Sequence, residues 1–320
     1  MSAGNGPGLL FLSQADVVRL LDVDNLLEML AGAFVELSAG RTSVPPRIAA
    51  RTPAGGLLGA MPGYIAGVLE TKVVSIFPQN HDRGLPSHQG LIALFDPESG
   101  APLAVMDAVS ITAIRTGASA AVAARYLTRS DAATLAIIGA GVQGRSNLAA
   151  FQRVREFKEI RIASRDAAKA QALAALSPNA RAVETFKEAV KGADVVCLCT
   201  DAREPVMTYM WLTEGAHVSS VGGTFGPEID PQTIGAATIF VESRDAVRQQ
   251  PPAGAHELQG IRPESVTEIG EVIAGTKPGR TSPEQLTVYK STGHAVEDAA
   301  AARLVYERAL AEGAGQRVAI

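Results

Sequence analysis

The segment at residues 139–144 reads Gly-Ala-Gly-Val-Gln-Gly, which is the glycine spacing of a dinucleotide-binding loop. The short apolar run Leu135–Ile138 precedes it, and a segment with helical spacing of apolar residues follows it. Gly139 permits a tight turn, Gly141 lets backbone N–H groups approach a pyrophosphate, and Gly144 allows the helix to pack closely on the strand. The glycines alone are a weak signal. Strand, loop and helix in this order predict a dinucleotide-binding domain of the Rossmann type.

The next predicted strand, Glu159–Ala163, ends in Ser164-Arg165-Asp166. Domains that bind NAD place an acidic residue near this position, where it accepts hydrogen bonds from the ribose diol. Arg165 instead offers a guanidinium that matches a 2′-phosphate in shape and charge, and Ser164 adds a hydroxyl donor. The alternative is a solvated Arg165 with Asp166 as a displaced NAD-type acid. The sequence therefore predicts NADP(H), with NAD(H) as the alternative cofactor.

The expected cofactor contacts include the glycine loop and the end of the second strand, together with four residues elsewhere. In chain order they are Thr116, Gly139, Ala140, Gly141, Val142, Gln143, Gly144, Ser164, Arg165, Thr200, Val221 and Ser291.

Two basic residues lie in segments that are otherwise apolar. Lys72 lies within the predicted strand Val68–Phe77, and Arg115 lies within the long apolar segment Val105–Leu127. Such side chains are rarely buried unless they are paired or functional, so each needs a counter-charge. Charges inside Val105–Leu127 would also be costly in a lipid bilayer, so a buried helix is predicted there rather than a membrane span.

The composition narrows the classes of function. The chain has 320 residues, 47% of them hydrophobic, and a net charge of −4 from evenly mixed acidic and basic residues. It therefore offers no broad basic field to nucleic acid or to an anionic membrane, and small-molecule chemistry is the expectation. The first residues lack a secretion signal, which predicts a cytoplasmic protein.

No metal site is predicted. Cys197 and Cys199 point to the same face of an apolar strand and are interpreted as buried thiols, because no partnering ligand cluster accompanies them. His256-Glu257 lacks the second histidine of a zinc-binding helix. His88 has two interpretations, a proton relay or a structural histidine at a strand edge.

The order of predicted elements divides the chain. An N-terminal α+β region begins with a helix capped by Ser13 that runs from Gln14 through Leu37, and it continues with strands and a hairpin. Strands and helices alternate from residue 134 onward, which predicts a parallel sheet. An alanine-rich helix is expected over Gly293–Gly313. The strands expected are Thr71–Phe77, Gly90–Phe95, Leu103–Met106, Thr134–Ile138, Glu159–Ala163, Asp194–Leu198, His217–Val221, Thr238–Val241 and Leu286–Tyr289.

Several segments, taken together and in order, resemble the ornithine cyclodeaminase/μ-crystallin family, which also includes certain alanine dehydrogenases and ketimine reductases. The likeness extends over nearly the whole chain. The segments that carry it, besides the glycine loop, are Val44–Arg47, Glu70–Val74, Leu85–Gln89, Leu94–Gly100, Ile111–Ala118 and Thr287–Gly293.

The resemblance implies an architecture: α/β, with a Rossmann-type parallel-sheet domain inserted in an α+β substrate and dimerisation domain. The expected bounds are 1–117 for the first part of the substrate domain, 118–292 for the NADP-binding domain, and 293–320 for the C-terminal helix that returns to the substrate domain. It also implies a homodimer, an active site in the cleft, and a small amino or imino acid as the substrate.

Catalytic and substrate-binding residues follow from the same resemblance. Arg47 and Arg115 match the family's carboxylate-binding arginines, and Lys72 matches the lysine next to the reacting nitrogen or carbonyl. Ser87 is expected to face the substrate. Without the resemblance, Arg47 could equally be a surface residue of a loop.

The chain departs from the cyclodeaminase pattern at residue 224. Ornithine cyclodeaminases carry an aspartate directly after a Gly-Gly pair, whereas this chain has Thr224 after Gly222-Gly223 and a shorter loop. A threonine hydroxyl cannot replace a carboxylate base. We therefore expect Thr224 to contact the substrate without supporting deamination.

The sequence thus predicts an NADPH-dependent reductase of small cyclic imino acids, such as pyrroline-2-carboxylate or piperideine-2-carboxylate. The alternative enzymes are an ornithine cyclodeaminase or an alanine dehydrogenase. The alternative of another class is a non-enzymatic, μ-crystallin-like protein that binds NADPH and a ligand. The presence of Lys72, Arg47 and Arg115 together favours the enzyme.

Overall fold

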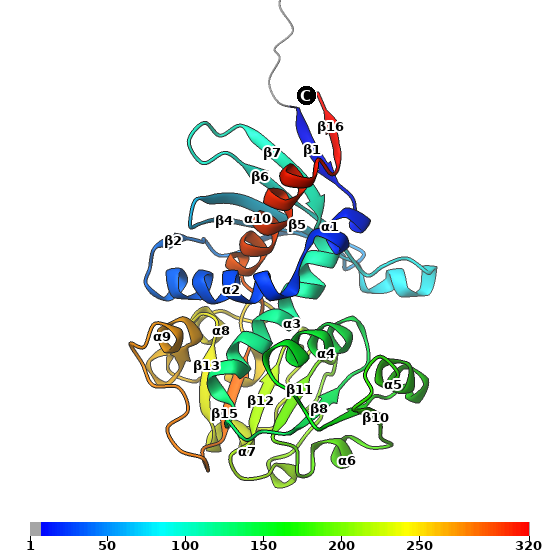
Figure 1. The fold of residues 1–320 in the computed structure, drawn as a ribbon, viewed down its shortest axis with the longest axis vertical. Coiled ribbons are helices and arrows are strands. Elements are labelled where there is room, and N and C mark those ends of the chain that lie inside the picture. The colour runs from blue at the N-terminus through cyan, green and yellow to red at the C-terminus, as the bar shows by residue number, and fades with distance from the viewer. Residues whose placement is uncertain (1–7, 320) are drawn as a thin grey trace, which may run out of the picture. The chain divides into compact units, whose positions relative to one another are not determined.

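The computed structural model describes residues 8–319, apart from the side chains of residues 81 and 82. The chain forms two compact units (Figure 1). Unit 1 contains residues up to Arg115 together with Ala295 onward, and unit 2 contains Thr116–His294. Unit 2 is thus a single insertion in the sequence of unit 1. The first boundary falls inside one helix, α3 (Ala108–Leu127).

Unit 1 is built on an eight-stranded sheet with the order β16-β1-β7-β6-β5-β4-β2, in which β3 also pairs with β4. The strands from β4 to β7 pair antiparallel with their neighbours, whereas β1 and β7 are parallel. The predicted hairpin around residues 96–101 is therefore confirmed. The strand bounds are β1 (Leu9–Leu12), β2 (Thr42–Ser43), β3 (Ile48–Arg51), β4 (Leu57–Ile65), β5 (Val68–Ile76), β6 (His88–Phe95), β7 (Pro102–Asp107) and β16 (Gln316–Val318).

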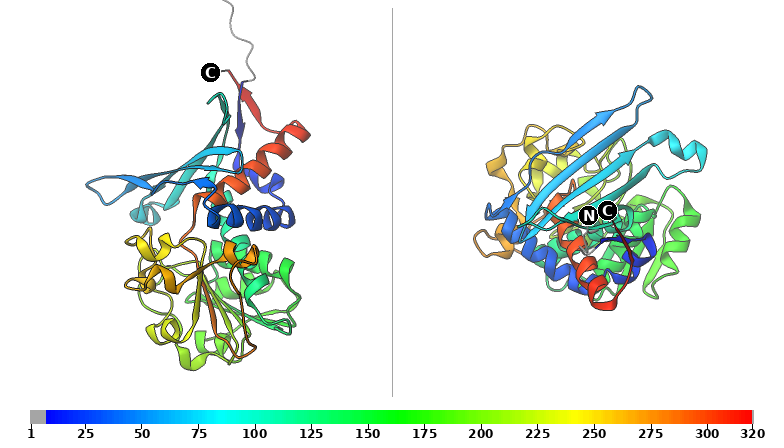
Figure 2. Two further views of the ribbon diagram at one scale, coloured as in Figure 1. Left: turned by 90° about the vertical axis from the view of Figure 1, so that its left-hand side faces the viewer. Right: turned by 90° about the horizontal axis from the view of Figure 1, so that it is seen from above.

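One face of this sheet packs against helices. The helices α1 (Gln14–Leu20), α2 (Val23–Ser38) and α10 (Ala295–Glu312) contact its strands and each other, and the left view of Figure 2 shows α2 and α10 on one side of the sheet. Because side chains alternate along a strand, a single row across the sheet faces these helices. That row is Met61, Lys72, Ile92 and Met106, and all four are buried.

The opposite face of the same sheet carries apolar side chains that remain exposed in this chain. Leu58 and Tyr64 on β4, Leu91 on β6 and Phe11 on β1 are each about half exposed. An apolar face of this kind is typical of a surface that contacts another protein.

The N-terminal helical region differs from the prediction of one continuous helix from Gln14 through Leu37. Ser13 does cap the first helix, in a reciprocal capping box with Asp16, as expected. The helix ends at Leu20, and Asp22 then caps a second helix by accepting a hydrogen bond from the backbone N–H of Asn25. The prediction was wrong because apolar spacing continues across the break, while Asp22 supplies the cap that starts a new helix.

Unit 2 is a doubly wound parallel sheet of eight strands in the order β10-β9-β8-β11-β12-β15-β13-β14. All of its pairings are parallel, which confirms the predicted Rossmann-type sheet. The strand bounds are β8 (Thr134–Ile138), β9 (Glu159–Ala163), β10 (Ala180–Ala182), β11 (Val195–Leu198), β12 (His217–Ser220), β13 (Thr238–Val241), β14 (Thr267–Glu268) and β15 (Thr287–Lys290).

The central strands of unit 2 are apolar along their whole length because both faces are covered. Leu135–Ile138 and all of β11 are buried. Their alternate residues, such as Ala136 and Val196, belong to a core that also contains Val218 and Val288. The helices of this unit are α4 (Val142–Val154), α5 (Ala167–Ala174), α6 (Phe186–Val190), α7 (Pro231–Ala236), α8 (Asp245–Arg248) and α9 (Ile269–Ile273). Short 3₁₀ turns occur at Pro78–Arg83 in unit 1 and at Tyr209–Trp211, His256–Leu258 and Pro263–Ser265 in unit 2. Within residues 8–319, no helix is long and apolar enough to cross a membrane.

Candidate active site

A buried cluster of charged side chains forms in unit 1 where α10 packs on the sheet. Asp298 of α10 accepts a hydrogen bond from Lys72 Nζ at 2.6 Å and another from Arg115 Nε at 2.9 Å. Arg115 Nη1 donates to Glu297 at 2.8 Å. The structure therefore brings together two of the predicted catalytic residues, Lys72 and Arg115, on one shared carboxylate.

The ammonium of Lys72 is only partly satisfied. Its side chain is 5% exposed, and it donates one hydrogen bond among the described residues, to Asp298. An ammonium carries three donors, so two remain for a ligand. Burial lowers the pKa of Lys72 below its ordinary value, and the carboxylate of Asp298 opposes that shift. A buried lysine with spare donors and a lowered pKa suits a group that gives up a proton.

Asp298 keeps its charge in spite of its burial. Burial alone would raise the pKa of Asp298, but the charges of Arg115 and Lys72, with the hydrogen bonds of both, outweigh it and hold the pKa below the usual range. The carboxylate is thus a fixed negative charge between two cations.

Glu70 lies on the same face of β5 as Lys72 and is 2% exposed. Neither of its carboxyl oxygens has a hydrogen-bond partner among the described residues. Burial raises the pKa of Glu70 to about 9, and the nearby carboxylate of Asp298 adds to the shift, while Lys72 and Arg115 oppose it. Glu70 is therefore a neutral carboxylic acid at pH 7, which leaves the two cations of the cluster balanced by Asp298 and Glu297.

The other two predicted substrate-binding residues of unit 1 are on loops. Arg47 is half-buried in the segment between β2 and β3, and Ser87 is half-buried directly before β6. Ser87 Oγ lies 3.1 Å from His88 Nδ1. Burial lowers the pKa of His88, which favours the neutral ring, and a neutral ring can exchange a hydrogen bond with the serine.

The glycine loop of unit 2 has the geometry that its sequence predicts. Gly139 adopts a φ of 104°, and a Cβ there would lie 2.5 Å from the carbonyl oxygen of Cys199. A Cβ on Gly144 would lie 2.0 Å from the carbonyl oxygen of Gly139, so helix α4 can approach the loop only with glycine at this position. At Gly141, by contrast, a Cβ would meet nothing within 4 Å.

The open side of this loop fits a dinucleotide. Gly141 is the N-cap of α4 and makes no side-chain cap, so the first backbone N–H groups of a 13-residue helix point toward the open side. Such a helix end binds anions through its N–H groups and its dipole. Val142, which follows, is 67% exposed, and Gln143 is half-buried. The residues present therefore fit the pyrophosphate of a nicotinamide dinucleotide.

The three polar residues that follow β9, Ser164, Arg165 and Asp166, have different contacts. Asp166 is the N-cap of α5 and accepts a hydrogen bond from the backbone N–H of Lys169, while Ser164 Oγ accepts one from the backbone N–H of Asp166. Arg165 is 78% exposed and pairs with Asp201 at 2.7 Å. The acid that was the NAD-type alternative is thus engaged in capping a helix.

A second buried polar cluster lies at the carboxyl ends of β11, β12 and β15. The Glu228 carboxylate accepts four hydrogen bonds: from the backbone N–H and the hydroxyl of Thr200, both at 2.6 Å, from Ser220 Oγ at 2.7 Å, and from the backbone N–H of Gly222 at 2.9 Å. Lys290 Nζ donates to Ser220 Oγ and to the Gly222 carbonyl, both at 2.8 Å, and lies 3.2 Å from Glu257. This cluster fixes the loops that follow the strands.

The remaining predicted residues lie around this second cluster. Thr200 belongs to it directly, and Val221 is half-buried beside Gly222. Thr224 is exposed on the loop that Lys290 and Glu228 hold. Thr116 and Ser291 are buried, and Ser291 Oγ lies 3.5 Å from Glu242.

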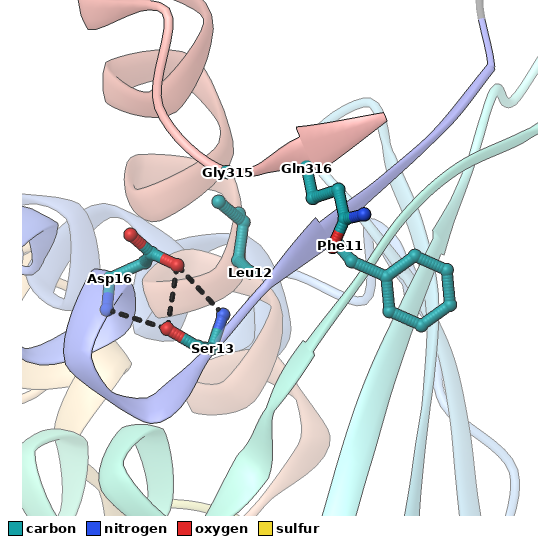
Figure 3. A pocket seen from close by; sticks show the side chains of 6 residues that line it. All are labelled: Phe11, Leu12, Ser13, Asp16, Gly315 and Gln316. Carbon is teal, nitrogen blue, oxygen red and sulfur yellow. Dashed lines mark hydrogen bonds between the residues drawn. The ribbon is translucent and has the colours of Figure 1, made fainter. Parts of the chain in front are cut away.

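No metal centre is found among the residues that the structure describes. Cys197 and Cys199 are free and buried, and burial raises the pKa of both thiols. A hollow of about 430 Å³ lies at the start of α1, and two of its polar side chains, Ser13 and Asp16, are bonded to each other (Figure 3). That hollow is not the candidate site.

The sequence interpretation missed the acidic half of both clusters: Glu70, Asp298 and Glu297 in unit 1, Glu228 and Glu257 in unit 2. One signal was present in the sequence. Glu297 and Asp298 open a helix that is mostly alanine, and two acids on its buried side imply buried cations elsewhere. Lys72 and Arg115 were the unmatched cations.

Comparisons with known proteins agree with this geometry. Alanine dehydrogenase of Archaeoglobus fulgidus is 34% identical over 317 residues, covering 97% of this chain and 98% of that protein. Ketimine reductase mu-crystallin of Rattus norvegicus is 39% identical over 257 residues, covering 79% and 80%. The structure of Thermococcus litoralis Δ1-pyrroline-2-carboxylate reductase in complex with NADH and L-proline superposes with a TM-score of 0.89 at 35% identity, covering 97% of this chain and all of that one.

The fold, the glycine loop and these relatives define a class, the NAD(P)-dependent oxidoreductases that act on C=N groups. The model of the ornithine cyclodeaminase/mu-crystallin family matches residues 9–313. The chain belongs to this family, and the predicted resemblance is confirmed.

Proposed function

We propose that this protein reduces small cyclic imino acids, such as five- or six-membered-ring 2-carboxylates, to the corresponding amino acids with NADPH. The observation that carries the proposal is the partly satisfied ammonium of Lys72, which is buried and held by Asp298 beside Arg115. Imine reduction needs a hydride, an oriented substrate and one proton donor. The bound dinucleotide supplies the hydride from its nicotinamide.

Each residue of unit 1 has a distinct role in this proposal. Arg47 and Arg115 bind the substrate carboxylate, since planar guanidinium groups match it in geometry. Lys72 donates a proton to the ring nitrogen as hydride reaches the imine carbon, so that C=N becomes CH–NH and the lysine is left neutral. Its lowered pKa reduces the cost of that transfer. Ser87 contacts the substrate, and His88 orients the serine hydroxyl.

Thr224 argues against a cyclodeaminase. Cyclodeamination oxidises an amine, accepts attack by an internal amine, releases ammonia and then returns the hydride; imine reduction is the last of these steps alone. A carboxylate near the reacting carbon assists the middle steps, and this chain has a hydroxyl in its place. The single reduction step does not require that carboxylate.

The test is a panel of cyclic and acyclic imino and keto acids, scored by NADPH oxidation, with ornithine assayed in parallel for ammonia. We expect clear reduction of a cyclic imino acid and no ammonia from ornithine. Proline and ammonia formed from ornithine at a useful rate would overturn the proposal. Efficient turnover of pyruvate with ammonia, without turnover of cyclic imines, would favour an alanine dehydrogenase instead.

The proposed preference for NADPH rests on Arg165. The solved relative holds NADH, so the preference belongs to residues of this chain rather than to the family. Arg165 is exposed at the end of β9, and Asp166 is engaged as a helix cap. A lost charge-assisted contact to a phosphate costs roughly 1.5–3 kcal/mol, which is more than tenfold in affinity. NADH binding as tightly as NADPH would contradict this preference.

We further propose a homodimer formed through the exposed apolar face of the unit 1 sheet. Leu58, Tyr64, Leu91 and Phe11 lie on the sheet and are too large and apolar to favour contact with water. Light scattering at micromolar concentration is expected to give twice the mass of 33.2 kDa. A monomer under these conditions would refute the assembly, and Leu91→Glu should shift a dimer toward monomers.

A further inference from the structure

An ion pair bridges the two strands that flank the glycine loop of unit 2. The strand order β9-β8-β11 places β8, which leads into the loop, between the other two. Arg165 follows β9 and Asp201 follows β11, and their side chains meet at 2.7 Å. Because all three strands are parallel, their carboxyl ends lie at one edge of the sheet. The ion pair therefore spans the carboxyl end of β8, where the glycine loop begins.

The loop is joined to both neighbouring strands at that edge. The backbone N–H of Gly139 donates to the carbonyl of Ala163 at 2.8 Å, and the backbone N–H of Cys199 donates to the carbonyl of Ile138, also at 2.8 Å. Arg165 lies two residues beyond the first contact and Asp201 two residues beyond the second. A phosphate bound at the loop would therefore be flanked by one guanidinium and one carboxylate.

The pair itself is weak and easily rearranged. Arg165 and Asp201 are 78% and 68% exposed, and exposed pairs contribute little to stability. The guanidinium has five N–H donors, and the bond to Asp201 comes from one nitrogen, Nη2. Arg165 can thus exchange a carboxylate for a phosphate, and Asp201 offsets part of the charge that attracts the phosphate.

We propose that Asp201 is a specificity-determining residue, whose carboxylate competes with the 2′-phosphate of NADPH for Arg165 and so limits the preference for NADPH over NADH. This inference rests on the proposed role of Arg165. NADH has no phosphate at the 2′ position, so the competition affects NADPH alone. Freeing Arg165 from an exposed ion pair of this kind changes its affinity for a phosphate by about three- to tenfold.

The experiment is a binding titration of the whole chain with NADPH and NADH, without an imino acid, at low and at high salt. For Asp201→Asn we expect the ratio of Kd for NADH to Kd for NADPH to rise about three- to tenfold at low salt, and by less at high salt because exposed charges are screened. In the Arg165→Ala background, Asp201→Asn should leave the ratio unchanged. Glu214→Gln is the matched control, since Glu214 is exposed before β12, at the opposite edge of the parallel sheet.

The outcomes separate this inference from the proposed function. If Arg165→Ala lowers the ratio but Asp201→Asn leaves it unchanged or lowers it, the role of Asp201 is wrong and that of Arg165 stands. If Asp201→Asn raises the ratio equally with and without Arg165, competition for the guanidinium is also wrong. If Arg165→Ala leaves the ratio unchanged, the proposed NADPH preference fails as well.

Discussion

The two units each bury a lysine among carboxylates, but the clusters differ in how completely their donors are used. In unit 2, Lys290 has three partners and the Glu228 carboxylate accepts four hydrogen bonds. In unit 1, Lys72 donates one hydrogen bond among the described residues, and the Glu70 carboxyl accepts none. A saturated cluster holds loops in place. An unsaturated cluster keeps donors and a proton for a ligand, at a cost in stability.

The largest effect is expected from removing Lys72, the lysine of the unsaturated cluster in unit 1. Lys72→Ala should lower the turnover of a cyclic imine by roughly 10²–10⁴, the usual contribution of a positioned acid or base. Folding should survive, because Asp298 keeps its bond to Arg115. The check is NADPH oxidation at saturating substrate, with circular dichroism to confirm folding. A variant that reduces cyclic imines normally would remove Lys72 from the mechanism.

The saturated cluster is tested by Glu228→Gln. Each carboxylate oxygen accepts one backbone N–H, from Thr200 on one side and from Gly222 on the other. Whichever way the amide is turned, its NH₂ group faces one of these donors. We expect a loss of about 1.5–3 kcal/mol in the free energy of unfolding, the range for a lost hydrogen bond to a charged group. Denaturant unfolding measures it, and a neutral effect would mean that the four bonds are not maintained.

The substitution of glutamate by glutamine should have a different effect on the free energy of unfolding at Glu70. Glu70→Gln removes no hydrogen bond, so the two proteins should differ least in the free energy of unfolding below a pH of about 4.5, where the Glu70 carboxyl is neutral in both the folded and the unfolded chain. The folded-state pKa of about 9 lies above the value of about 4.5 in the unfolded chain, so the folded state holds the proton more tightly. The contribution of this group is complete below pH 4.5 and is lost as pH rises toward 9.

The effect of Glu70 is measured by comparing the free energy of unfolding of the wild-type protein with that of Glu70→Gln as the pH changes. From pH 6 to pH 7 the wild-type chain should lose up to about 1.4 kcal/mol relative to Glu70→Gln, the value of one pKa unit. Denaturant unfolding of both proteins in the same buffers cancels the groups that they share. Parallel pH profiles would show that Glu70 is ionised in the folded protein, contrary to its environment.

The sequence predicted the sheet and the glycine loop of unit 2 better than it predicted the buried charged clusters. The parallel sheet of unit 2 was predictable because each strand is a short apolar run bounded by turns, and Thr134–Ile138 and Glu159–Ala163 were correct at both ends. The glycine loop was predictable because Gly139 has a backbone conformation that only glycine adopts easily and Gly144 packs too closely on the loop for a Cβ. Local chemistry decides both features.

The clusters were less predictable because their members are distant in sequence. Lys72 and Arg115 could be singled out as buried cations, but nothing near them in the chain identifies Asp298 as their partner. Glu228 illustrates the same difficulty, since its donors lie on two different strand ends. Burial of Glu70 without a partner has no local signal at all, because a glutamate in a strand is expected at the surface.

The 226 residues that separate Lys72 from Asp298 have a consequence for synthesis. A ribosome adds about 5–20 residues per second, so roughly 10–45 s pass between the two. All of unit 2 emerges in that interval and can fold as a continuous segment, whereas the sheet of unit 1 waits for α10. During this time Lys72 and Arg115 have no Asp298 to bond with, and the apolar face that α10 will cover is exposed. A nascent chain stalled before residue 295 would therefore be a substrate for chaperones.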